Sequence, residues 1–370
     1  MVTIPGYPGC GCSVLQRRLA WRDAARHAKG VSTVLVTGAA GKLGRRVVDR
    51  LVARPAVDSV VAVDMAPLPP SYETVEEHLL DLSLPGAQAR LASLAKGADV
   101  FLHLAWDPKG RGNLSALRNV LAAAEAVQPA QLVHLSSATV YGAWPDNPVP
   151  LTEEAALRPN PELAYAVDKR AAEVSVGLWA EDHPEVAVAV LRPACTVGSD
   201  RHPFHYALAV GNRPLLGGEG RLVQYLHVDD LAEAVVHAWE HGLAGTFNVA
   251  PDNGVQEEVA STLQGGRAKL SLSRPVKAAM SAWRWGLWRR GVPPGAQAYA
   301  TYSWVVAGDK LRRTGWQPQY TSEEALVVSD ERSHWDELPP GWRRSLTVAG
   351  AATAVAVASA GGALMWRRRR

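Results

Sequence analysis

Three short motifs whose side chains could together move a hydride and a proton follow one another along the chain. A glycine-rich turn comes first, two adjacent serines second, and a tyrosine and a lysine four residues apart third. Such groups can bind a pyrophosphate, hold a reacting oxygen by a hydrogen bond, and exchange a proton with it. Together they predict an enzyme that uses a nicotinamide dinucleotide. The motifs are residues 37–44, 136–142 and 165–169.

The glycine turn contains Gly38, Gly41 and Gly44, between a predicted strand and a predicted helix. Glycines let the backbone turn tightly, let a pyrophosphate approach the helix N-terminus, and let helix and strand pack closely. Asp64 ends the next predicted strand, where a carboxylate can accept hydrogen bonds from both adenosine ribose hydroxyls. A 2′-phosphate would meet like charge there, so the pattern favours NAD over NADP. A solvated aspartate at a strand end stays open as the alternative.

Tyr165 and Lys169 are four residues apart and therefore share one face of the predicted helix. The lysine ammonium, with the positive nicotinamide, is expected to favour the phenolate and to lower the pKa of Tyr165 from about 10 towards the working pH. Lys169 could also donate a hydrogen bond to the nicotinamide ribose. A tyrosine and a lysine at this spacing can also lie on a protein surface without such a role. The serine segment that precedes the pair in this chain therefore strengthens the prediction.

The elements that must position these residues form a regular alternation of apolar runs and helical segments. The apolar runs do not alternate with polar residues, which is typical of strands buried on both faces. The sequence therefore predicts an α/β fold with a Rossmann-type doubly wound parallel sheet. Strands are expected at residues 31–37, 59–64, 98–105, 131–136 and 186–192, and helices at 43–53, 114–127, 162–180 and 228–239.

The predicted domain organisation follows changes in this pattern. After Arg192 the alternation gives way to loops rich in glycine, proline and histidine, as expected of a smaller C-terminal substrate lobe. We expect a flexible N-terminal extension at 1–30 and an NAD-binding Rossmann domain at 31–192, to which later segments return. Residues 193–330 would mainly form the substrate lobe. A linker at 331–344, an apolar tail at 345–366 and a basic terminus at 367–370 would follow.

Composition excludes several classes of protein. The net charge is +3, and four arginines at residues 367–370 account for it, so the body of the chain offers no general attraction to nucleic acid. Three cysteines cannot build a disulfide framework, and Cys10 with Cys12 supplies too few ligands for a zinc site. Charged residues interrupt the N-terminal segment where a secretory signal would be apolar. These features favour a cytoplasmic protein.

Two stretches raise the question of membrane contact. Residues 345–366 carry no charge over 22 positions, which is long enough to span a bilayer, but they are mostly alanine, glycine, valine and threonine. A membrane anchor on the cytoplasmic side and a flexible alanine-rich tail both stay open. Residues 282–290 combine tryptophans with arginines, which suits either a water–lipid interface or a lobe helix that buries its tryptophans.

The joint pattern of the three motifs resembles the extended short-chain dehydrogenase/reductase family, the NAD-dependent epimerases and dehydratases. The resemblance covers about residues 31–326, most of the chain. It also includes His103-Leu104-Ala105, Asn113, Leu191-Arg192-Pro193, His227-Val228-Asp229-Asp230, Phe247-Asn248-Val249 and the segment 311–316.

The resemblance implies a role for each motif residue. Tyr165 would be the general acid/base and Lys169 its partner, while Ser137 would hydrogen-bond the reacting oxygen. Asn113 would hold the active-site helix and its water network, with an ordinary helix cap as the alternative. No metal is implied, since His227, Asp229 and Asp230 match a stretch that caps a helix and joins the lobes. The expected cofactor contacts are Gly38, Gly41, Lys42, Leu43, Gly44, Asp64, Asp81, Leu82, Leu104, Ala105, Tyr165, Lys169, Pro193 and Cys195.

The same resemblance implies an epimerase or dehydrogenase acting at a secondary alcohol or ketone, with a nucleotide-linked sugar as the first choice of substrate. Ala138 and Thr139 stand where a 4,6-dehydratase has acidic residues, which disfavours dehydration. Residues 106–112 form a short connection, which indicates a smaller or more open pocket. A membrane-associated dehydrogenase of a sterol-like or lipid-linked alcohol and a non-catalytic NAD-binding regulator are the alternatives. A homodimer would be in keeping with the family.

Overall fold

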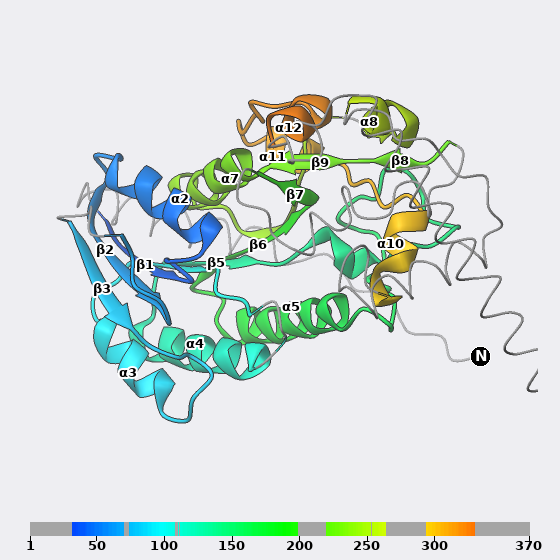
Figure 1. Ribbon diagram of the computed structural model, residues 1–370. Coiled ribbons are helices and arrows are strands. Elements are labelled where there is room, and N and C mark those ends of the chain that lie inside the picture. Colours follow the sequence, from blue (N-terminus) through cyan, green and yellow to red (C-terminus); the bar gives the residue numbers. More distant parts are fainter. Residues whose placement is uncertain are drawn as a thin grey trace, which may run out of the picture.

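The computed structural model describes residues 32–69, 74–107, 110, 112–198, 220–252, 254–263 and 294–329. Within these residues the chain builds a seven-stranded parallel sheet in the order β10-β6-β5-β4-β1-β2-β3 (Figure 1). The strands are β1 (Ser32–Thr37), β2 (Val57–Asp64), β3 (Val75–Leu79), β4 (Val100–His103), β5 (Gln131–Leu135), β6 (Ala187–Pro193) and β10 (Gly245–Val249).

Successive residues of each central strand pack into different cores on the two faces of the sheet. Val34 and Val36 of β1 belong to one buried cluster, whereas Leu35 between them belongs to another. β4 does the same, since Leu102 and Phe101 lie in different clusters. Burial on both faces explains why the strands appear in the sequence as continuous apolar runs. The predicted doubly wound sheet is thereby confirmed.

Helices cover both faces of the sheet (Figure 1). α2 (Lys42–Val52) and α7 (Val228–Glu240) pack against each other on one face. α3 (Ala87–Leu94), α4 (Asn113–Val127) and α5 (Ala164–Asp182) form the layer on the other. Because β1 lies between β2 and β4, the strand order reverses at the β1–β4 pair, and α/β proteins bind ligands at such a reversal.

The segment after β6 divides between the sheet and a smaller lobe. α7 and β10 return to the Rossmann layers, since β10 pairs with β6 in parallel. The lobe is built on β7 (Cys195–Val197), which pairs with β9 (Tyr225–His227), and on β8 (Leu222–Val223), which pairs with β11 (Val255–Gln256). Its short helices are α8 (Glu257–Leu263), η4 (Pro294–Ala296), α10 (Gln297–Thr301) and α12 (Ser322–Val328), whereas α11 (Asp309–Arg312) packs on β10 of the main sheet.

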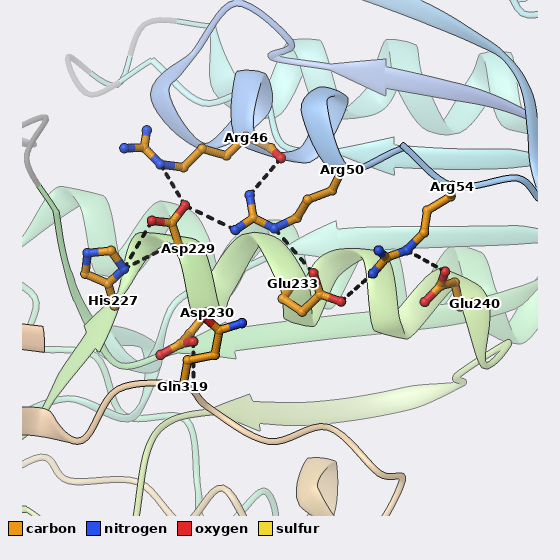
Figure 2. Close-up of polar contacts among 9 residues, drawn as sticks. All are labelled: Arg46, Arg50, Arg54, His227, Asp229, Asp230, Glu233, Glu240 and Gln319. Carbon is orange, nitrogen blue, oxygen red and sulfur yellow. Dashed lines mark hydrogen bonds and ion pairs between the residues drawn. The ribbon is translucent and has the colours of Figure 1, made fainter. Parts of the chain in front are cut away.

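A row of ion pairs joins α2 to α7, which we call the α2–α7 ladder (Figure 2). Arg46 and Arg50 lie one turn apart on α2, and Arg54 follows two residues after its end; the three face three acidic residues of α7. The 2.6 to 3.3 Å pairs join Arg46 and Arg50 to Asp229, Arg50 and Arg54 to Glu233, and Arg54 to Glu240.

The residues at the start of α7 tie this helix to the lobe. The His227 ring nitrogen accepts a hydrogen bond from the Asp229 amide at 3.3 Å, and the ring lies 4.4 Å from the ring of Tyr320. The carboxylate of Asp230 accepts the backbone N–H group of Gln319 (Figure 2) and that of Tyr320. The three residues whose types could suggest metal ligands thus cap and anchor a helix.

Several expectations concern parts of the chain that lie outside the described residues. They are the N-terminal extension at 1–30, the tryptophan–arginine stretch at 282–290, the linker, the apolar tail at 345–366 and the basic terminus. Of the helices that the structure describes, none has the length and apolar character needed to cross a membrane.

Candidate active site

The glycine turn lies between β1 and α2, at the point where the strand order reverses. Gly38 has a positive φ of 77°, and a Cβ there would lie 2.6 Å from the backbone nitrogen of Ala105, two residues after β4. A Cβ on Gly44 would collide with the carbonyl oxygen of Gly38. The turn therefore tolerates no side chain at either position, and it leaves the first turn of α2 open for a phosphate group.

Asp64 ends β2 beside this turn. One carboxylate oxygen accepts the Ala40 amide at 3.0 Å, and the other accepts the amides of Met65 and Ala66 at 2.6 and 3.1 Å. These bonds hold the carboxylate next to the turn, which fits its expected place beside an adenosine ribose. The glycine cradle and the carboxylate together suit NAD.

The remaining expected cofactor contacts surround the same end of the sheet. Lys42 is the exposed first residue of α2, and Leu43 packs on the core beneath it. Asp81 accepts hydrogen bonds from the amide and hydroxyl of Ser83 at 2.9 and 2.7 Å, so it closes a turn. Leu82 and Leu104 are buried, and Ala105 is half-buried against Gly38. Pro193 is the last residue of β6, and Cys195 is the first residue of β7.

Ser137 and Tyr165 meet at the carboxyl end of β5. Ser137 immediately precedes the 3₁₀ turn η2 (Ala138–Tyr141) and its hydroxyl accepts hydrogen bonds from the amide and hydroxyl of Thr139 at 3.2 and 2.9 Å. The side chain of Tyr165, in the first turn of α5, forms a hydrogen bond with Ser137. The two hydroxyl groups are therefore adjacent, as a shared reacting oxygen requires.

Burial raises the pKa of Tyr165 to about 12, although the hydrogen bond with Ser137 opposes the change. The sequence-based expectation of a lowered pKa is wrong for the chain itself. Lys169 Nζ lies 6.0 Å from the Tyr165 ring centroid and donates instead to the carbonyl of Leu135 at 2.8 Å. Desolvation of the phenol therefore outweighs the Ser137 hydrogen bond, which favours the phenolate.

Lys169 is buried and keeps its ammonium between a carbonyl and an indole. Nζ lies 3.6 Å from the ring centroid of Trp106, and Trp106 meets the Tyr165 ring edge-on at 6.1 Å. Burial lowers the pKa of Lys169 to about 7, an effect that the nearby charge of Glu173 opposes. A lysine with this pKa can exchange a proton near neutrality.

Asn113 is the first residue of α4 and acts on the loop before it. Its side-chain oxygen accepts the Asp107 amide at 2.7 Å, and its side-chain nitrogen donates to the Asp107 carbonyl at 2.9 Å. The helix cap itself is Gly112, with φ of 72°. Asn113 therefore holds the short connection that follows β4 and is not a simple cap.

Sequence reasoning missed a buried polar network behind the active site. The guanidinium of Arg192 binds both carboxylate oxygens of Glu173, at 2.6 Å in the closest contact, and donates to the Tyr141 hydroxyl at 2.7 Å. Glu173 also accepts the hydroxyl of Ser136, the neighbour of Ser137. The available signal was the position of Glu173, four residues after Lys169 on the same helix face.

The pairing of His103 with a second buried histidine, His134, was also missed. His103 and His134 are register partners on β4 and β5, and their rings stack at 5.5 Å. The ring of His103 shares a 2.8 Å hydrogen bond with Thr37. Burial lowers the pKa of His103 to about 3 and that of His134 well below its usual value, because a charged imidazole cannot be solvated there.

A dinucleotide cradle beside a Ser–Tyr–Lys cluster on a doubly wound sheet defines a Rossmann-type enzyme of nicotinamide chemistry. The sequence model of the NAD-dependent epimerase/dehydratase family matches residues 34–250. The chain belongs to that family, within the extended short-chain dehydrogenases/reductases. The predicted family and its cofactor, NAD, are confirmed.

The chain is also similar to individual proteins. An uncharacterised protein of Mycobacterium tuberculosis is 27% identical over 321 residues, which cover 82% of this chain and 84% of the relative. UDP-glucose 4-epimerase of Mycolicibacterium smegmatis is 28% identical over 237 residues, covering 55% and 72%. The solved structure of UDP-glucose 4-epimerase from Thermus thermophilus, in complex with NAD, is 20% identical in sequence. The match covers 80% of this chain and 97% of the solved one, and its TM-score of 0.61 shows that the two share a fold.

Proposed function

We propose that this NAD-dependent enzyme oxidises and re-reduces a secondary alcohol of a nucleotide-linked sugar, as a 4-epimerase does. The observation that carries the proposal is the hydrogen-bonded pair of Ser137 and Tyr165 with Lys169 one turn further along α5. This cluster lies at the carboxyl end of the parallel strands, the same end at which the glycine turn and Asp64 follow β1 and β2.

The side chains divide the work of removing two hydrogens from one carbinol. NAD, which the glycine turn and Asp64 would hold, would supply the acceptor for the hydride of the C–H bond. Ser137 donates a hydrogen bond to the alcohol oxygen and fixes its distance from Tyr165. The Tyr165 oxygen takes the hydroxyl proton as the carbonyl forms, and returning the hydride and proton to the opposite face would give the epimer.

Tyr165 must be ionised to accept that proton, although burial raises its pKa to about 12. The positive nicotinamide ring and the Lys169 ammonium are the charges that would favour the phenolate in the complex. Lys169, whose pKa lies at about 7, is the group through which the proton would pass on towards solvent. Because burial keeps the Tyr165 phenol neutral in the chain alone, the base would become active only when the positive nicotinamide ring is bound.

Two features support a sugar nucleotide and epimerisation. A relative matched over 55% of this chain is a UDP-glucose 4-epimerase. Ala138 and Thr139, which follow Ser137, offer no carboxyl group to eliminate water from a keto-sugar, which disfavours a dehydratase.

The test replaces Tyr165 by Phe and follows the conversion of UDP-glucose to UDP-galactose by NMR. Y165F should lose turnover by at least about a thousandfold, since general acid–base catalysis contributes roughly 10²–10⁴ and Ser137 loses its neighbour too. NAD affinity, measured by calorimetry, should change less than about threefold. Y302F, which removes a tyrosine hydroxyl from the lobe instead, is the matched control. Unchanged turnover in Y165F would refute the mechanism.

A further inference from the structure

The contact between Lys169 and Trp106 has no part in the roles described so far. Trp106 follows β4 by three residues, and its half-buried indole packs on the core of the α3–α4–α5 face. Lys169 Nζ lies 3.6 Å from the centre of its ring, well inside the range of a cation–π contact. The same indole meets Tyr165 edge-on, with an interplanar angle of 84°.

The carboxylate that shares a face of α5 with Lys169, one turn further along, is already engaged. Glu173, one turn further on, holds Arg192 at 2.6 Å and accepts the hydroxyl of Ser136. Lys169 instead donates to the Leu135 carbonyl at 2.8 Å. Besides that carbonyl oxygen, the π face of Trp106 offers negative potential to the ammonium at close range.

We propose that Trp106 is a positioning residue for the Tyr165–Lys169 pair: its indole face holds the protonated Lys169 ammonium, and its edge orients the Tyr165 ring. The assignment of a catalytic purpose rests on the proposed function, whereas the contact with the ammonium does not. Removing the indole should therefore make Lys169 easier to deprotonate and leave the phenol free to turn.

The charged and titratable groups around Lys169 act in different directions. Glu173 on α5 raises the pKa of Lys169, while burial lowers it to about 7. Burial and the Lys169 charge both lower the pKa values of His103 on β4 and His134 on β5, so both imidazoles stay uncharged near pH 7. Tyr165, with a pKa raised to about 12, is also neutral there. His103, His134 and Tyr165 therefore do not titrate in the pH range in which Lys169 does.

The experiment measures the titration midpoint of Lys169 by NMR of the full-length chain carrying isotope-labelled lysine, with the signal assigned through K169R. W106L should lower the midpoint by about 0.5–1 pH unit, from the strength of a partly desolvated cation–π contact. W106F, which keeps a weaker aromatic face, should give a smaller decrease. W179L removes another half-buried indole from the far end of α5 and should leave the midpoint unchanged.

A midpoint in W106L equal to that of the unmodified chain would overturn the proposal. If W106L does not fold, tryptophans with increasing numbers of fluorines replace the natural residue, which weakens the π face at nearly constant shape. The Lys169 midpoint should then fall stepwise, and a constant midpoint would overturn the proposal equally. The titration needs no substrate, so its failure is distinguishable from a failure of the Y165F test.

Discussion

Glu173 carries a negative charge into the core, and its neighbours explain why it can remain there. The carboxylate binds the Arg192 guanidinium and the Ser136 hydroxyl, and Arg192 also reaches Tyr141, whose hydroxyl donates to Asn248 at 2.8 Å. Buried charges of this kind require a partner for almost every polar atom. The network thus fixes the backbone just before Ser137.

Replacing Glu173 by Gln should lower the free energy of unfolding by about 3–5 kcal/mol, because Arg192 would remain buried without its counter-charge. The measurement is urea unfolding at neutral pH. The double variant E173L/R192M, which removes both charges, should be more stable than E173Q. If the double variant were less stable than E173Q, the loss of the ion pair, and not the uncompensated charge of Arg192, would account for most of the change in unfolding free energy.

At the next scale, the β1–α2 turn shows how an element is shaped by the absence of side chains. Gly44 lies inside the first turn of α2, where an added methyl group would strike the carbonyl of Gly38 and lie 2.7 Å from that of Ala39. Backbone carbonyls cannot move aside as a side chain can. The conflict must therefore open the turn that would bind the pyrophosphate.

G44A should weaken NAD binding by at least about tenfold, since the phosphate would lose helix N-terminal amides. Calorimetric titration with NAD measures the loss. G177A is the matched control: Gly177 lies in α5 with open space around its Cα, so alanine there should raise stability by about 0.5–1 kcal/mol and leave NAD binding intact. Wild-type NAD affinity in G44A would contradict this role of the turn.

Across the whole molecule, the periodic parts of the sequence were predictable and the lobe was not. Strands such as β1 and β4 are buried on both faces, so their composition alone indicates a parallel sheet. The sequence predicts that later segments return to the Rossmann domain but not which ones, because the pairing of β10 with β6 is recorded in no local pattern. The lowered pKa expected for Tyr165 failed similarly, because burial and the Lys169–Trp106 contact arise only in the folded chain.

Global stability should fall on acidification because of the buried histidines. The pKa of His103 is about 3 in the folded chain and about 6.5 when unfolded, so the unfolded chain binds more protons below pH 6.5. Stability is therefore complete above that pH and is lost progressively towards pH 3. At pH 5 the loss from His103 alone is about 2 kcal/mol.

Urea unfolding at pH 7.5 and pH 5.0 measures this difference. H103Q should reduce it by about the 2 kcal/mol that His103 contributes, and H134L should reduce it as well. H78Q changes a half-buried histidine on β3 and serves as the control. An equal pH dependence in H103Q and the unmodified chain would show that other groups control the acid response.

The α2–α7 ladder affects how the contact between the two helices responds to temperature. Its arginines and carboxylates alternate from Arg46 to Glu240 and share partners, so they form a network and not separate pairs. The cost of withdrawing charges from water falls as temperature rises, whereas apolar contacts gain little more. The two helices are therefore bound to each other relatively more firmly in a warm cell than in a cold one.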